Sequence, residues 1–101
     1  MTMDLTTASN MQLQAQYEEL NKTLGEHTMA MASAEGWLDE TLRRIAAGRE
    51  DEDRHELGNK AQDLLNELKI HKKSATIIIL KLYKIQYEFD RRTGTNTSEH
   101  N

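Results

Sequence analysis

The sequence predicts an all-α fold, a long antiparallel helical hairpin, on three observations. The composition is 30% charged and 37% hydrophobic residues in a chain of 101 with no proline, which is typical of long helices and coiled coils. Two heptad patterns follow each other along the chain, one in each half. Turn-forming residues separate them at about residues 48–53, so the two patterned segments are expected to fold back on each other.

The second half carries the more regular heptad pattern, from Leu57 to Phe89. Its members alternate steps of four and three residues without a break, the spacing of a helix that lies along another helix. We therefore expect a helix over about residues 53–92, ended by Gly94. The members of this second seam are Leu57, Ala61, Leu64, Leu68, His71, Ala75, Ile78, Leu82, Ile85 and Phe89.

The first half repeats the same spacing from Leu13 to Ile45. His27 and Thr41 are its only polar members apart from the tyrosine hydroxyl of Tyr17. The two seams come into phase if the chain folds back at its middle, which would set Leu24 opposite Ile78. The members of this first seam are Leu13, Tyr17, Leu20, Leu24, His27, Met31, Ala34, Leu38, Thr41 and Ile45.

The bounds of the first helix follow from its capping residues. Ser9 followed by Gln12 matches a capping box, so the helix is expected over about residues 9–47. Gly25 and Gly36 fall outside the seam and weaken the helix without necessarily ending it. A break near Gly25 would give the alternative fold, a three-helix bundle.

The turn between the helices is acidic. Gly48 suits a left-handed C-terminal position, and Asp53 with Glu56 provides an N-cap and a carboxylate at the third helical position. The acidic run 50–53 lies at the positive end of the second helix dipole, which stabilises it there. We interpret the run as a capped, solvated turn. The alternative is a cation or partner site that includes His55.

Two histidines interrupt the otherwise apolar seams. His27 and His71 are expected about one layer apart on opposite helices. No seam carboxylate accompanies them, so they offer too few ligands for a metal. We expect them to specify the register, because a buried polar residue disfavours slipped alignments. Acid below about pH 6 should then loosen the middle of the hairpin.

A second apolar stripe on the second helix points to a binding surface. It lies about 130° around the axis from the seam, so one partner helix cannot cover both. Another chain is expected to bury it, either a second copy in a four-helix bundle or a helical client. In a three-helix bundle the start of the chain would cover it instead. The predicted partner-binding residues are Trp37, Leu65, Ile79, Leu80, Tyr83 and Tyr87.

Composition and motifs argue against other classes of protein. A net charge of -4 is unfavourable for nucleic-acid binding, and the lysines of the second helix are spread around its axis as a solvated exterior. We expect no catalytic, cofactor or metal site and no enzyme activity, because no nucleophile or phosphate-loop pattern occurs. No signal-peptide pattern or membrane-spanning run occurs, so a cytoplasmic protein is expected. The predicted organisation is a flexible tail at 1–8, one helical domain at 9–93 and a disordered tail at 94–101.

In size, acidity and an apolar second helix available to a client, the chain resembles small type III secretion chaperones. The resemblance implies a chaperone or adaptor for a helical client, such as a component of a secretion system. The homodimer is expected from the second apolar stripe. One alternative is a phage- or plasmid-type inhibitor that binds a host protein through its acidic turn. Another is a structural dimeric coiled coil.

Overall fold

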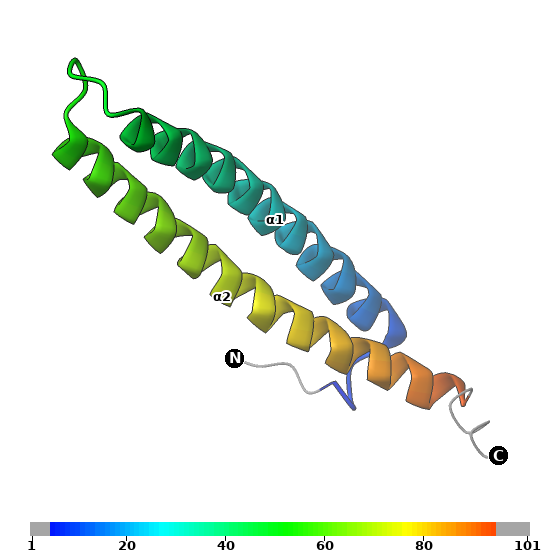
Figure 1. The fold of residues 1–101 in the computed structure, drawn as a ribbon. Coiled ribbons are helices and arrows are strands. Elements are labelled where there is room, and N and C mark those ends of the chain that lie inside the picture. Colours follow the sequence, from blue (N-terminus) through cyan, green and yellow to red (C-terminus); the bar gives the residue numbers. More distant parts are fainter. Residues whose placement is uncertain (1–4, 95–101) are drawn as a thin grey trace. The chain divides into compact units, whose positions relative to one another are not determined.

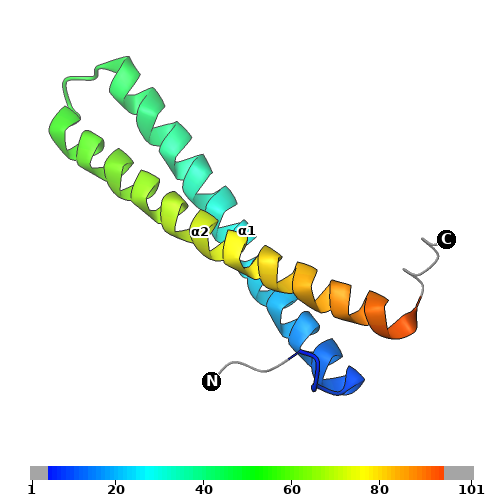
Figure 2. The same ribbon diagram turned by 90° about the horizontal axis from the view of Figure 1, so that it is seen from below.

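The computed structural model describes residues 5–94, which form two long helices and no strand. Helix α1 spans Asn10–Ala47 and helix α2 spans Arg54–Thr93 (Figure 1). The two helices pack against each other, as predicted. α1 is one continuous helix through Gly25 and Gly36 (Figure 2). The alternative of a break near Gly25 with three helices therefore does not hold for the described residues.

The chain divides into two compact units, and α1 and α2 contribute to both. Among the described residues, the terminal unit consists of 5–24 and 76–94. The turn unit is Gly25–Ala75. Every residue of the two predicted seams is buried or half-buried in its unit. The heptad pattern thus identified the packed face of both helices.

The core of the terminal unit is centred on Leu13 of α1 and Ile85 of α2. These side chains are 0% and 1% exposed, and Ala8 packs with them. Ala8 directly precedes the N-cap Ser9, and Leu13 is the fourth helical residue, which are the two positions of a hydrophobic staple. Half-buried residues pack around this core: Leu5, Tyr17, Leu20 and Phe89.

The start of α1 is closed by the predicted capping box. The backbone N–H of Ser9 donates to the side-chain oxygen of Gln12 over 2.8 Å. The backbone N–H of Gln12 donates to the Ser9 hydroxyl over 3.1 Å. Two backbone donors that the helix cannot satisfy are thereby paired.

In the turn unit the buried positions are small. Ala34, Ala61 and Ala75 are buried, which lets the two helix backbones approach each other. Thr41 is also buried, at 2% exposed. Its hydroxyl donates to the backbone carbonyl of Trp37 over 2.7 Å. A polar seam residue is therefore accommodated, because its hydrogen bond is made within its own helix.

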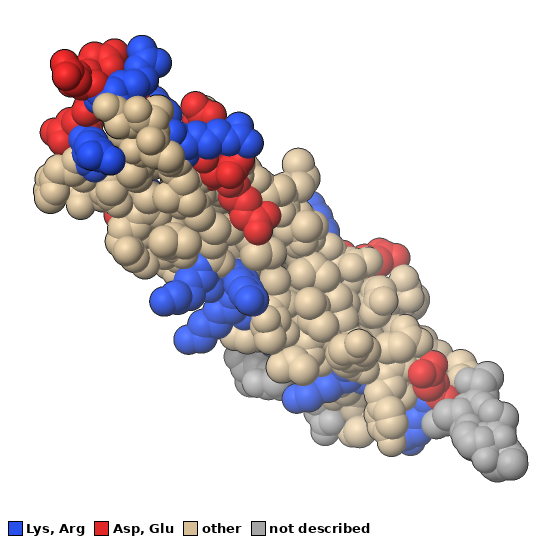
Figure 3. Space-filling model, viewed as in Figure 1, with Lys and Arg blue, Asp and Glu red and all other residues tan. Residues whose placement is uncertain are grey.

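The turn between α1 and α2 has the predicted chemistry. Gly48 adopts a left-handed φ of 61° just after α1. The Asp53 carboxylate accepts hydrogen bonds from the backbone N–H groups of His55 (2.9 Å) and Glu56 (3.3 Å), as an N-cap does. Figure 3 shows Lys, Arg, Asp and Glu side chains gathered over this turn. Gly94, with a φ of 76°, ends α2 as predicted.

The predicted tails lie mostly outside the described residues, which exclude 1–4 and 95–101. Within the described part, residues 5–7 form a turn before Ala8. Neither helix of the described chain combines the length and apolar character that crossing a membrane requires.

Candidate functional site

All six predicted partner-binding side chains are exposed. Trp37 and Leu65 belong to the turn unit, and the other four belong to α2 of the terminal unit. Aromatic and branched apolar side chains that remain this accessible are typical of contact surfaces. Their exposed fractions are 58% for Trp37, 46% for Leu65, 42% for Ile79, 56% for Leu80, 70% for Tyr83 and 66% for Tyr87.

An open hollow of about 390 Å³ lies beside Tyr83 and Tyr87. We call it the N-terminal hollow because the turn that precedes α1 forms its far wall. The predicted site residues Tyr83 and Tyr87 are brought together here with residues that the sequence did not single out. The lining residues are Leu5, Thr6, Tyr83, Lys84, Tyr87 and Glu88.

A second hollow, of about 170 Å³, lies on the other side of Tyr83. We call it the interhelix hollow because Tyr17 comes from α1 and the remaining residues come from α2. Tyr83 is common to both hollows and therefore forms a ridge between them. The lining residues are Tyr17, Ile79, Leu82, Tyr83 and Gln86.

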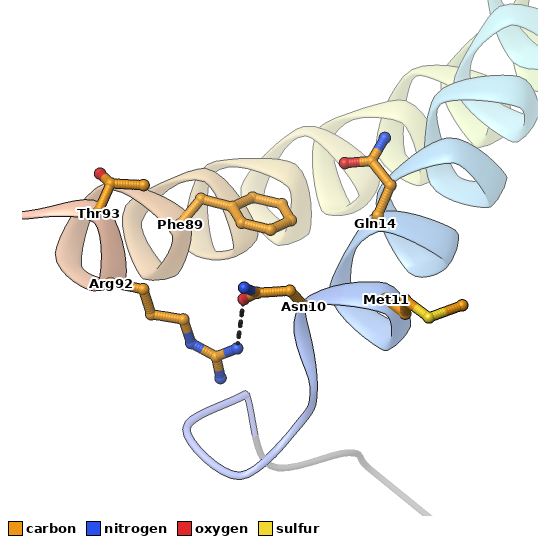
Figure 4. A pocket seen from close by; sticks show the side chains of 6 residues that line it. All are labelled: Asn10, Met11, Gln14, Phe89, Arg92 and Thr93. Carbon is orange, nitrogen blue, oxygen red and sulfur yellow. Dashed lines mark hydrogen bonds between the residues drawn. The ribbon is translucent and has the colours of Figure 1, made fainter.

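A third hollow, of about 340 Å³, lies where the start of α1 meets the end of α2. Figure 4 shows Arg92 reaching from α2 to the side-chain amide of Asn10 on α1, with Phe89 one turn earlier. The Arg92 guanidinium donates to the Asn10 side-chain oxygen over 2.9 Å. Met11, which is 84% exposed, also lines this hollow.

Arg92 also holds the N-terminal turn in place. Its guanidinium donates to the backbone carbonyl of Leu5 over 2.8 Å and to the Glu88 carboxylate over 2.7 Å. The wall of the N-terminal hollow is therefore fixed to α2 by a charged hydrogen bond, which is stronger than a neutral one.

Glu88 is a buried carboxylate, 4% exposed, with two cationic partners. Arg91 and Arg92 both donate hydrogen bonds to it. The bond from Arg91, followed by that from Arg92, lowers the pKa of Glu88 from 4.5 to about 2. The carboxylate is therefore ionised at neutral pH, and its charge is compensated inside the protein.

The seam histidines are in direct contact within the turn unit. The Nδ1 atoms of His27 and His71 are 2.8 Å apart, and the ring centroids are 5.0 Å apart with the planes tilted by 55°. We expected these two residues about one layer apart along the helices, and their side chains nevertheless reach each other. Among residues 5–94 no group of three His, Cys, Asp or Glu side chains is placed to hold a metal ion. What the pair can do is share one hydrogen bond.

Trp37 in the turn unit has a cationic neighbour. The Lys60 ammonium lies 5.7 Å from the centroid of the Trp37 ring, within the range of a cation–π interaction. The heptad pattern did not single out Lys60, so this neighbour of Trp37 is known only from the structure. Lys60 lies over one face of the indole, and the Trp37 side chain remains mostly exposed.

Three carboxylates of the acidic turn are paired with groups of the same chain. Glu52 pairs with Arg44 of α1, and Asp51 lies 3.4 Å from the Arg49 guanidinium. Asp53 is occupied as the N-cap of α2. These contacts favour the interpretation of a capped turn over that of a site for a cation or partner.

Sequence reasoning missed the part of the site that comes from the residues before α1. Leu5 and Thr6 form a wall of the N-terminal hollow, although they fall in a stretch that reads as a tail. A signal was present: Ala8 and Leu13 flank the capping box at staple spacing, which predicts that the chain before Ser9 packs back on the helix.

The site is composed of apolar and aromatic side chains with tyrosine hydroxyls and a lysine at its edge, a combination suited to protein contacts. Comparison with models of known protein families, with curated proteins and with solved structures finds no match to this chain. The function is therefore inferred from the site alone.

Proposed function

We propose that this protein is a non-enzymatic protein-binding module, a small cytoplasmic chaperone or adaptor that binds a helical client through α2. The observation that carries the proposal is the exposure of Leu80, Tyr83 and Tyr87, each more than half accessible, on the outer face of one helix. Hollows on either side of Tyr83 provide places for a partner's side chains. Apolar anchors next to such hollows are the usual centre of a protein interface.

The energetics favour a partner for this face. Full burial of one large apolar side chain contributes about 1.5 to 3 kcal/mol, so covering several of them offsets much of the entropy lost on association. The terminal unit itself buries little: of the large side chains described in it, Leu13 and Ile85 are the fully buried ones. A small two-helix core of this kind gains stability from further burial.

The same face would be covered if two copies associated into a four-helix bundle. A homodimer is thus the second version of the proposal, and it draws on the same exposed residues. The two versions differ in mass and in composition, which makes them separable by experiment.

The test compares Tyr83→Glu with a matched control, Met29→Glu, in the full chain. Met29 is 74% exposed, close to the 70% of Tyr83, but it lies in the turn unit. We expect Tyr83→Glu to abolish co-purification of the client from the native host, or to convert a dimer to a monomer in light scattering. Met29→Glu should leave both unchanged. Equal behaviour of the two variants would contradict the proposal.

A further inference from the structure

The outer face of α2 in the terminal unit is built as a ridge between two hollows. Tyr83 forms the ridge, with the N-terminal hollow on one side and the interhelix hollow on the other. A helix that packs on another helix sets its rows of side chains into the grooves beside such a ridge. The described chain contains no strand, so an added β-strand would find no sheet edge.

The two sides of the ridge differ in charge. Lys84 lines the N-terminal hollow, and Lys81, three residues earlier, shares its edge of the helix. Neither lysine forms an ion pair among the described residues, whereas the neighbouring Glu88 is already paired with Arg91 and Arg92. The interhelix hollow is lined by no charged residue. One side of the ridge therefore carries two lysines, and the hollow on the other side is lined by uncharged residues.

From this asymmetry we infer that the partner is an amphipathic helix of another protein, with carboxylates along the edge of its apolar stripe that meets Lys81 and Lys84. The inference rests on the proposed function and specifies the chemistry of its client. The apolar side chains of the helix fill the two hollows beside Tyr83. Its carboxylates meet the lysine edge, which sets its orientation.

The charge pattern disfavours a second copy as the occupant. In an antiparallel twofold dimer the same edge of both copies meets, so Lys81 and Lys84 of one copy would lie beside those of the other. Like charges opposed in this way lower affinity. A flat anionic lipid surface satisfies the lysines but leaves both hollows unfilled. The acidic amphipathic helix is the occupant that packs beside the Tyr83 ridge, fills both hollows and pairs with the two lysines.

The probes are two labelled 18-residue peptides with the same leucine stripe, one flanked by glutamates and the other by lysines. Fluorescence anisotropy measures the binding of each to the full chain. We expect the glutamate peptide to bind about fivefold tighter at low salt, because two exposed ion pairs contribute that order of affinity. The difference should shrink at high salt.

Lys81→Glu/Lys84→Glu should invert the preference between the peptides. The matched control Lys69→Glu/Lys73→Glu makes the same charge change on exposed lysines of the turn unit and should preserve it. Circular dichroism verifies that both variants keep their helices. Equal binding of the two peptides, or the same effect from the control, would overturn the inference.

Two further outcomes separate this inference from the proposed function. If both peptides bind equally and Tyr83→Glu abolishes both, the binding face stands but the acidic partner does not. If neither peptide binds any variant, the proposed function fails as well. Stronger binding to anionic vesicles than to the glutamate peptide, or dimerisation of the wild type that Tyr83→Glu reverses, also overturns the inference.

Discussion

The Nδ1 atoms of His27 and His71 lie 2.8 Å apart across the two helices of the turn unit, so one ring must donate and the other accept. Both histidines are half-buried, and one ring provides the N–H donor and the other the nitrogen acceptor. It is a hydrogen bond between side chains that no other seam position offers.

Removing one histidine is expected to cost more than removing both. His71→Leu leaves the Nδ1 of His27 without its partner in a half-buried position, which should lower the free energy of unfolding by about 1 kcal/mol. His27→Leu/His71→Leu replaces the pair by apolar contacts and should be neutral or stabilising. Urea unfolding of the two single variants and the double variant tests this. A double variant that loses the sum of the single losses would contradict it.

The Glu88 network predicts a loss of stability over an acidic pH window. Because the pKa of Glu88 is lowered from 4.5 to about 2 in the folded protein, its contribution to stability is complete above pH 4.5 and is lost as the pH falls towards 2. Glu88→Gln should be less stable than the wild type at pH 7, and the difference should shrink over that window. Urea unfolding across the range measures it. Glu67→Gln, an exposed glutamate of α2, is the control and should show no such trend.

The interior glycines of α1 offer a stabilising change. Nothing lies within 4 Å of a Cβ atom placed on Gly25 or Gly36. Gly25→Ala and Gly36→Ala should each raise the free energy of unfolding by about 1 kcal/mol, since alanine favours the helix. Gly48→Ala should instead lower it by about 1 to 2 kcal/mol, because its φ of 61° is left-handed. Thermal unfolding compares the three variants, and a stabilising Gly48→Ala would refute the argument.

The helix caps predict a local loss of stability. Ser9→Ala and Asp53→Ala each remove a side-chain acceptor from the first turn of a helix and should cost about 1 kcal/mol. Ser33→Ala, an exposed position inside α1, serves as the control and should not destabilise the protein. Chemical unfolding distinguishes the cases. Equal stability of Ser9→Ala and the wild type would show that the capping box contributes nothing.

The heptad spacing predicted most of the fold because a helix can bury only one stripe against one neighbour. Every seam position from Leu13 to Ile45 and from Leu57 to Phe89 is buried or half-buried. The caps at Ser9 and Asp53 are local in sequence, so they too could be predicted. The alternation of steps alone could not place His27 against His71, because contact between neighbouring layers depends on side-chain rotamers.

The candidate site was predicted less completely. Tyr83 and Tyr87 follow from the second stripe, and both are exposed as the pattern requires. The hollow beside them depends on Leu5, whose backbone carbonyl accepts a hydrogen bond from the Arg92 guanidinium of α2. Contacts between residues so far apart in the chain leave no periodic signal. Burial of Glu88 is equally invisible in the pattern, because it requires two arginines to converge on it.

The Arg92 side chain has a practical consequence for handling the protein. A single guanidinium donates hydrogen bonds to Leu5 and Asn10 near the start of the sequence and to Glu88 near its end. Truncation before Ser9, or an affinity tag fused there, will thus disturb the hydrogen bonds of the last turns of α2. Reporter groups are better attached near Glu50, where the hydrogen bonds of Arg92 are left intact.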